Sequence, residues 1–260
     1  MTKFNQRGEE VIRSLPGSDF GIDVIRGNIQ GVSYIHKFGL NPDVDTAAIE
    51  DIWDVDGTKT WYDADQTLEI VSASTNDDGD PVGTGARTVT IVGLDDNGAE
   101  ITQTATMNGT TAVALATDLM VVYRAWVLSA GTVATNDGLI TIRLASAGAT
   151  QAQIIAGNGQ TLMAIYQVPA SKKGYLYSMT GKLLGSTVAD ATINLMVRPS
   201  GGAWNVKEVM AIRTAGTSTF RDEYYLPIEL DALSQVRMTA ATSANNTIVG
   251  GSFDIVLVDD

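Results

Sequence analysis

Apolar and polar side chains alternate with a period of two along many short segments of this 260-residue chain. From Ile101 to Met107 the sequence reads ITQTATM, which places Ile101, Ala105 and Met107 on one parity and three threonines on the other. Successive side chains of a β-strand point to opposite faces of the sheet. The segment therefore predicts a strand with one mostly apolar face and one threonine face.

Turn signals separate these segments. Arg87–Leu94 is rich in β-branched residues, and Asn97-Gly98 follows it with the two residue types that best tolerate the positive φ of a hairpin turn. A second hairpin signal, TNDG, stands at 135–138. Further strands are expected at 19–27, 31–39, 67–74, 99–107, 119–129, 139–144, 161–168, 174–184, 192–198, 204–213, 218–226, 235–242 and 251–258.

This pattern predicts an all-β fold of two antiparallel β-sandwich or jelly-roll-like domains preceded by a short N-terminal arm. The arm covers residues 1–19, where EEVIRSL is long enough for one or two helical turns before Pro16-Gly17 ends them. We expect an N-terminal β domain at 20–150 and a C-terminal β-sandwich at 151–260. The small, glycine-rich segment 146–160 is interpreted as the joint between the two domains.

Composition excludes several classes of site. The chain contains no cysteine, which removes disulfides, thiolate metal sites and cysteine nucleophiles. Its net charge of −13 opposes contact with the phosphates of a nucleic acid. No apolar run approaches the ~20 residues that a membrane helix needs. We therefore expect neither nucleic acid nor membrane as a partner, although Lys3, Arg7 and Arg13 give the arm a slight basic excess.

The catalytic inventory is small. His36 is the only histidine, and no G-x-S-x-G nucleophile motif is present. A serine nucleophile needs a histidine base supported by a carboxylate, so we interpret His36 as a packed or surface residue. The sequence thus predicts a protein that is not an enzyme, with no catalytic, cofactor-binding or metal-ligating residues and no cofactor.

One acidic and aromatic segment leaves an alternative open. Trp53, Trp61 and Tyr62 stand among three acidic pairs: Glu50/Asp51, Asp54/Asp56 and Asp63/Asp65. Two carboxylates are enough for glycoside hydrolysis, and aromatic rings stack on sugars, so a glycan hydrolase is one interpretation. A solvated acidic loop that its tryptophans anchor to a sheet is the interpretation that we favour.

A second acidic segment precedes a Gly-Thr-Gly run at 83–85. A phosphate-binding loop must lead into a helix N-terminus, but a strand is expected here. Asp77, Asp78 and Asp80 do not have the spacing of an EF-hand. We favour a solvated loop tip over a weak calcium site.

Several longer stretches carry a likeness to a known family. They are GIDVIRGNIQGVSYIHKFGLNPDVDT, EDIWDVDGTKTW, GTGARTVTIVGLDDNGAEITQTATMNGT, NGQTLMAIYQVPASKKGYL and the closing GSFDIVLVDD. Together they resemble a family of tailed-bacteriophage virion structural proteins, from about Phe20 to the C-terminus. The chain departs from the family at Val55-Asp56-Gly57 and in the insert DDGDP at 77–81, both in expected loops.

The resemblance implies a structural part of a virion. We expect a capsid decoration or cement protein, made in the host cytoplasm, that binds the outer capsid surface and stabilises the shell. Its expected partners are the major capsid protein or neighbouring virion proteins, and further copies of itself in a homo-oligomer such as a trimer. The alternatives are a tail, neck or fibre component that contacts the host surface, and a virion-associated glycan hydrolase.

Overall fold

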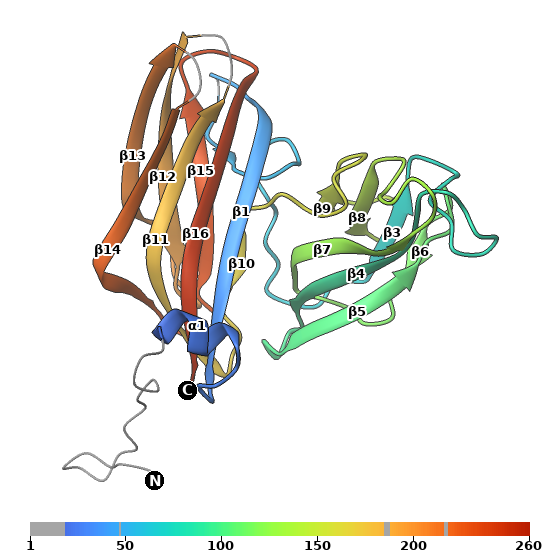
Figure 1. Ribbon diagram of the computed structural model, residues 1–260, viewed down its shortest axis with the longest axis horizontal. Coiled ribbons are helices and arrows are strands. Elements are labelled where there is room, and N and C mark those ends of the chain that lie inside the picture. The colour runs from blue at the N-terminus through green and yellow to red at the C-terminus, as the bar shows by residue number, and fades with distance from the viewer. Residues whose placement is uncertain (1–18, 47, 185–187, 216–217) are drawn as a thin grey trace.

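The computed structural model describes residues 19–46, 48–184, 188–215 and 218–260. Over these residues the protein has one short helix and sixteen strands, and the strands form four antiparallel sheets. The predicted all-β fold is therefore confirmed. Figure 1 shows two lobes, which we call the sandwich (β1, β2 and β10–β16) and the inserted lobe (β3–β9).

Two sheets form the sandwich. The first has the order β1 (Val32–Val44), β16 (Thr247–Asp259), β11 (Lys172–Leu184) and β14 (Ser218–Leu230). The second has the order β10 (Ile165–Gln167), β15 (Gln235–Thr242), β12 (Val188–Arg198) and β13 (Asn205–Ala215), with the short β2 (Glu50–Asp51) also paired to β15. The last strand of each order is an edge strand: β14 in the first sheet and β13 in the second.

The eight strands of these two orders pair in a nested way. In chain order the first pairs with the last (β1 and β16), β10 pairs with β15, β11 with β14, and β12 with β13. A long antiparallel ribbon that is folded once at the β12–β13 turn and then rolled up gives this pairing, which is the strand order of a jelly roll. The sandwich thus has a jelly-roll topology, with the inserted lobe between its first two strands.

The sandwich core lies between the two sheets. A strand was expected at 251–258, and the alternate residues Phe253, Ile255 and Leu257 of β16 are buried. They belong to one hydrophobic cluster with Ile193 and Met238 of the facing sheet. Burying these side chains supplies the main apolar driving force that holds the two sheets together.

Two smaller sheets form the inserted lobe. One has the order β6 (Val113–Ala114), β3 (Leu68–Ser72), β8 (Ile140–Leu144) and β9 (Thr150–Ile154), and the other has the order β5 (Glu100–Thr106), β4 (Ala86–Leu94) and β7 (Val121–Ala130). The Asn97-Gly98 hairpin joins β4 to β5, and Gly98 has φ +71° as such a turn requires. On β5 the threonines are exposed and Ala105 is buried, as the alternation predicts.

Two strand pairings differ from the sequence interpretation. TNDG at 135–138 does not form a hairpin, because β7 pairs with β4 and β8 pairs with β3. The segment 146–160, interpreted as a joint, contains β9, which pairs with β8. A turn signal predicts a local reversal of the chain, but it does not determine which strands pair with each other.

The predicted division at residue 150 also differs from the sheet pairing. β1, expected in an N-terminal domain, pairs along its length with the C-terminal strand β16. The sandwich and the inserted lobe share buried contacts too, since Val121 and Tyr123 of β7 lie in the sandwich cluster. We propose a division in which residues 65–155 form an insertion in a single jelly roll, rather than two consecutive domains.

The segment 19–27 was expected to be a strand, and this expectation is wrong. It contains helix α1 (Phe20–Ile25), whose N-cap is Asp19. The Asp19 carboxylate accepts the amide N–H of Gly21 at 2.8 Å and that of Ile22 at 3.4 Å, which satisfies two backbone donors of the first turn. Six residues are too few for hydrophobic periodicity to separate helix from strand.

Candidate functional site

His36 lies on the outer face of the first sandwich sheet. Its side chain is 47% exposed, its ring stacks on Phe38, and its Nδ1 lies 2.6 Å from a carboxylate oxygen of Asp254 on β16. Strand pairing brings the two residues together across 218 positions of sequence, because His36 is directly opposite Asp254 in the β1–β16 register. No local sequence pattern indicates this partner.

Asp254 is the centre of a polar cluster on that face. Its carboxylate accepts hydrogen bonds from the hydroxyls of Tyr34 and Ser178, the latter at 2.6 Å, and the Arg221 guanidinium lies 3.5 Å away. Burial alone would raise the pKa of Asp254, but the hydrogen bonds from Ser178, Tyr34 and His36 lower it below its ordinary value. Asp254 is therefore a carboxylate that accepts hydrogen bonds, not an acid that donates a proton.

A serine, a histidine and an aspartate thus meet here, but in the wrong order for nucleophilic catalysis. In a catalytic triad the histidine lies between the serine and the carboxylate and takes the serine proton. Here the carboxylate of Asp254 lies between Ser178 and His36 and contacts both. The arrangement orients side chains and does not activate Ser178.

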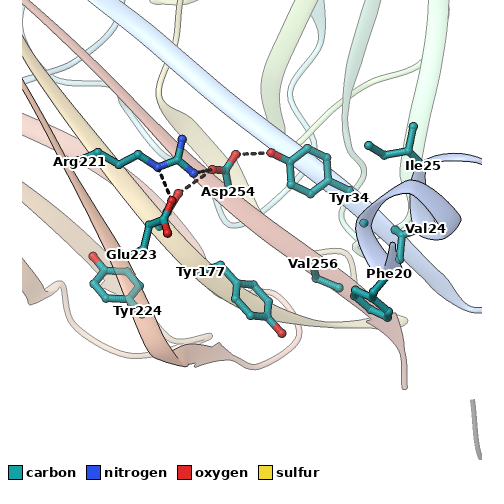
Figure 2. A pocket seen from close by; sticks show the side chains of 12 residues that line it. Phe20, Val24, Ile25, Tyr34, Tyr177, Arg221, Glu223, Tyr224, Asp254 and Val256 are labelled. Carbon is teal, nitrogen blue, oxygen red and sulfur yellow. Dashed lines mark hydrogen bonds and ion pairs between the residues drawn. The ribbon is translucent and has the colours of Figure 1, made fainter. Parts of the chain in front are cut away.

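A groove of about 500 Å³ runs across the same face between α1 and β14. Figure 2 shows Arg221, Asp254 and Tyr34 in a row along one side of the groove. Tyr177 and Phe20 lie below this row in the view. Residues from α1, β1, β11, β14 and β16 line it. Its volume is within the range of small-molecule sites in proteins.

The neighbouring edge of the sandwich is apolar and exposed. In the β11–β14 ladder, residues 224–227 of β14 stand opposite the single residue Tyr177, so β14 bulges out of the sheet there. Pro227 lacks the N–H that a ladder needs, which fits this irregularity. We call the following exposed side chains of β13 and β14 the edge surface: Val206, Val209, Phe220, Tyr225 and Leu226.

The acidic segment at 50–56 is not a solvated loop, and that expectation is wrong. Glu50, Asp51 and Asp54 are buried. Asp51 pairs with Arg237 at 3.2 Å and accepts the Lys59 amide at 2.7 Å, whereas the carboxylate of Glu50 accepts from Asn41 at 2.9 Å. These partners occupy the carboxylates of Asp51 and Glu50, which belong to the packing of β2 against β15, whereas Asp54 accepts the amide of Leu162 at 3.1 Å.

The remaining members of the acidic pairs lie apart from these. Asp56 and Asp63 are exposed, Asp65 is half-buried, and Asp63 lies 3.4 Å from Arg198. The three pairs therefore do not converge as two free carboxylates in one cleft. The glycan hydrolase interpretation loses the geometry on which it depends.

The two tryptophans of the acidic segment, Trp53 and Trp61, differ in burial. Trp53 is 2% exposed, packs in the core of the inserted lobe and donates its indole N–H to the carbonyl of Gly57 at 3.0 Å. Trp61 is half-buried and lies 5.5 Å from Trp204, centroid to centroid, while Tyr62 is half-buried. Trp53 has the buried position that the anchor interpretation requires.

The second acidic segment is also a packing element. Asp77 is fully buried, which corrects the expectation of a solvated loop tip. Its carboxylate accepts the Ser72 hydroxyl at 2.6 Å and the amides of Ala86, Asp137 and Gly138 at 2.7, 2.8 and 2.9 Å. Asp78 instead accepts the exposed amide of Asp80 at 2.9 Å. Within the described ranges, no group of three or more acidic or histidine side chains is placed to hold a metal ion.

Two buried lysines connect the lobes, and sequence reasoning missed both. Lys37 of β1 donates to the carbonyl of Tyr123 in β7, and Lys59 donates to the carbonyl of Gln151 in β9 at 2.6 Å. Burial lowers the pKa of each from 10.5 to about 7. Lysine in a strand or loop is normally exposed, so no local pattern marks such a residue.

The basic residues of the arm, Lys3, Arg7 and Arg13, lie outside the described residues. In the portion of the chain with assigned structure, no helix has the length and apolar character needed to cross a membrane.

Comparison with known proteins adds little. No protein-family model and no curated protein sequence matches the chain. Among solved structures, the alignment with broad bean stain virus has 11% identity and a TM-score of 0.24, and covers 96% of this chain and 90% of that one. The alignment with infectious bursal disease virus strain Gx has 10% identity and a TM-score of 0.24, covering 88% and 72%. Superpositions this poor carry no argument about function.

Proposed function

We propose that this chain is a non-enzymatic structural protein of a tailed-phage virion, which decorates the outer capsid surface and stabilises the shell. The observation that carries the proposal is the edge surface. Tyr225 is 98% exposed and Leu226 is 77% exposed, on an edge strand of the sandwich. The sequence resemblance to tailed-phage virion proteins indicates that the particle is a phage virion. The edge surface is the part of this chain that we propose to contact it.

The edge surface has the features of a contact site. Edge strands expose unpaired backbone groups and invite aggregation, so proteins protect them with bulges, prolines and charges. β14 has the bulge at 224–227, Pro227 and the charged run Arg221–Glu223, yet it also presents large apolar side chains beside them. Protection against random pairing combined with exposed apolar side chains favours one specific partner.

The partners follow from this surface and from charge. An acidic body, net −13 over the whole chain, suits the outside of a DNA-filled shell better than its interior. We propose the major capsid protein as the partner of the edge surface, and further copies of this chain as a second partner. A stable dimer or trimer needs an interface of more than roughly 1,000 Å². The protein is made in the host cytoplasm and acts on the virion.

A tail, neck or fibre role is the second candidate. The groove between α1 and β14 favours it, because a preformed groove is of use to a protein that contacts a host surface. The third interpretation, a glycan hydrolase at residues 50–65, has no supporting geometry, since its central carboxylates are paired and buried.

The edge surface is tested by binding to particles assembled without this chain. We expect the double substitution Tyr225→Ser with Leu226→Ser to lower co-sedimentation with such particles by at least about tenfold, as for the loss of two central contacts. The matched control is Leu128→Ser, because Leu128 is an equally apolar residue, 58% exposed, on β7 of the inserted lobe. Equal binding by both variants would contradict the proposed contact.

A further inference from the structure

We infer that the groove between α1 and β14 is a binding site for a neutral carbohydrate. The inference rests on the residues that line the groove and is independent of the proposed contact with the shell. The groove and the edge surface share β14 but use different residues of it, so one molecule can use both.

The lining has the two components that a sugar requires. Tyr34, Tyr177 and Phe20 are between 41% and 49% exposed, and their rings offer apolar platforms for the C–H face of a sugar ring. The groove also presents Arg221, Glu223 and Asp254, which are donors and acceptors for hydroxyl groups. A purely apolar ligand would leave these polar groups without new partners on binding, which costs free energy.

The charges of the lining select a neutral ligand. Arg221 is paired with Glu223 at 2.9 Å and faces Asp254 at 3.5 Å, so carboxylates outnumber guanidinium groups in the groove. An anionic sugar or a phosphate would meet this excess of negative charge. A cation would have to displace Arg221 from two carboxylates. A ligand hydroxyl can contact Arg221 and Glu223, whose side chains are 55% and 72% exposed, without displacing the four groups that contact Asp254.

The polar groups are also held in place before any ligand arrives. Asp254 is fixed at Oδ1 by the hydroxyl of Tyr34 and the ring of His36, both from β1, and at Oδ2 by the hydroxyl of Ser178 from β11. Burial and the hydrogen bond to Asp254 raise the pKa of Tyr34 to about 12, so its hydroxyl stays protonated as a donor. Such preorganisation reduces the entropy that binding must overcome.

The inferred activity is binding and not hydrolysis. A glycosidase needs one protonated carboxylic acid to give a proton to the leaving oxygen. The pKa of Asp254 is lowered by its hydrogen bonds, and Glu223 is exposed beside Arg221. A lowered pKa at Asp254 is the opposite of what a general acid needs, and Glu223 is already paired with Arg221.

The experiment uses the purified full-length chain on an array of neutral gluco-, galacto- and manno-oligosaccharides, with uronic-acid oligosaccharides as the anionic set. Calorimetric titration of the best neutral binder follows. We expect Tyr177→Ala to weaken its binding by at least about tenfold, and Tyr177→Phe to retain it, because stacking depends on the ring. Arg221→Ala should weaken it as well.

The matched control is Tyr225→Ala, since Tyr225 is adjacent in the fold but does not line the groove. Melting temperatures of all variants exclude unfolding as the cause. Polysaccharide from the host envelope and free oligosaccharides are compared in parallel, which shows whether the ligand is a polymer or a small sugar. Absence of any neutral sugar binding tighter than about 10 mM, or binding that Tyr177→Ala leaves unchanged, would overturn the inference. So would a preference for the anionic set.

Discussion

At the scale of single residues, Asp77 tests whether the second acidic segment stabilises the fold by packing and hydrogen bonding, and not by binding a metal ion. Its buried carboxylate accepts hydrogen bonds from Ser72, Ala86, Asp137 and Gly138, and so joins three segments of the inserted lobe. Asp77→Ala leaves these donors without an acceptor, and we expect it to lower the free energy of unfolding by about 3–5 kcal/mol. Chemical denaturation measures the loss.

The control is Asp78→Ala, which removes only the exposed contact with the Asp80 amide and should change stability by no more than about 0.5 kcal/mol. The same proteins test the calcium alternative. If calcium raised the melting temperature of the unaltered chain and Asp78→Ala abolished that rise, the segment would be a metal site and the packing account would be wrong.

We expect an unusual pH dependence of the free energy of unfolding, because Lys37, Lys59 and Asp54 are buried. Burial raises the pKa of Asp54 from 3.8 to about 7, so between these values the folded state binds the extra proton and stability falls as pH rises. The two lysines titrate at about 7 when folded and 10.5 when unfolded, so above pH 7 the unfolded state binds the extra protons and stability rises again. These groups together give a minimum near neutral pH.

Urea denaturation between pH 5 and about 9.5 measures this profile, below the range where tyrosines ionise. We expect the double substitution Lys37→Met with Lys59→Met to flatten the rise above pH 7, which is on the order of 4 kcal/mol per lysine at most. Asp54→Asn should flatten the fall below pH 7 and leave the rise in place. An unaltered rise in the double variant would mean that the two ammonium groups are not buried in solution.

At the scale of elements, β1 passes very close to the two segments that enter and leave the inserted lobe. A Cβ atom on Gly39 would collide with the carbonyl oxygen of Ile52 and the amide nitrogen of Ala164, which are hydrogen-bonded to each other at 2.9 Å. We therefore expect Gly39→Ala to destabilise the protein by about 1–3 kcal/mol. Limited proteolysis of the connecting segments should become faster as well.

Gly250 supplies the control for this substitution. It lies on the neighbouring strand β16, opposite Leu40, and a Cβ there would be in ordinary contact, 3.5 Å from its nearest neighbours. Gly250→Ala should leave both stability and proteolysis nearly unchanged. If the two variants behave alike, the close approach at Gly39 does not exist.

Most strands could be predicted from the sequence, because alternation and turn residues are local properties. The hairpin at Asn97-Gly98 and the C-terminal strand β16 are examples. Helix α1 could not be separated from a strand, because six residues are too few for hydrophobic periodicity to decide between them. The buried acidic groups were missed because their partners, such as Arg237 for Asp51, are distant in sequence.

At the scale of the whole molecule, strand partners were beyond local reasoning. The pairing of β1 with β16 joins the two ends of the described chain, and our proposal that residues 65–155 form an insertion depends on it. The same pairing creates the polar cluster, because Tyr34 and His36 reach Asp254 only across it. The groove could therefore not be predicted, although each of its residues belongs to a predicted segment or to α1.

The number of copies per particle tests the central claim most directly. Quantitative mass spectrometry or gel densitometry of purified virions, with the major capsid protein as the internal standard, measures it. A decoration protein that follows the symmetry of the shell should be present in tens to hundreds of copies, in a fixed ratio to the major capsid protein. A count of about six or twelve copies, as at a neck or tail tip, would contradict decoration and favour the tail or fibre role.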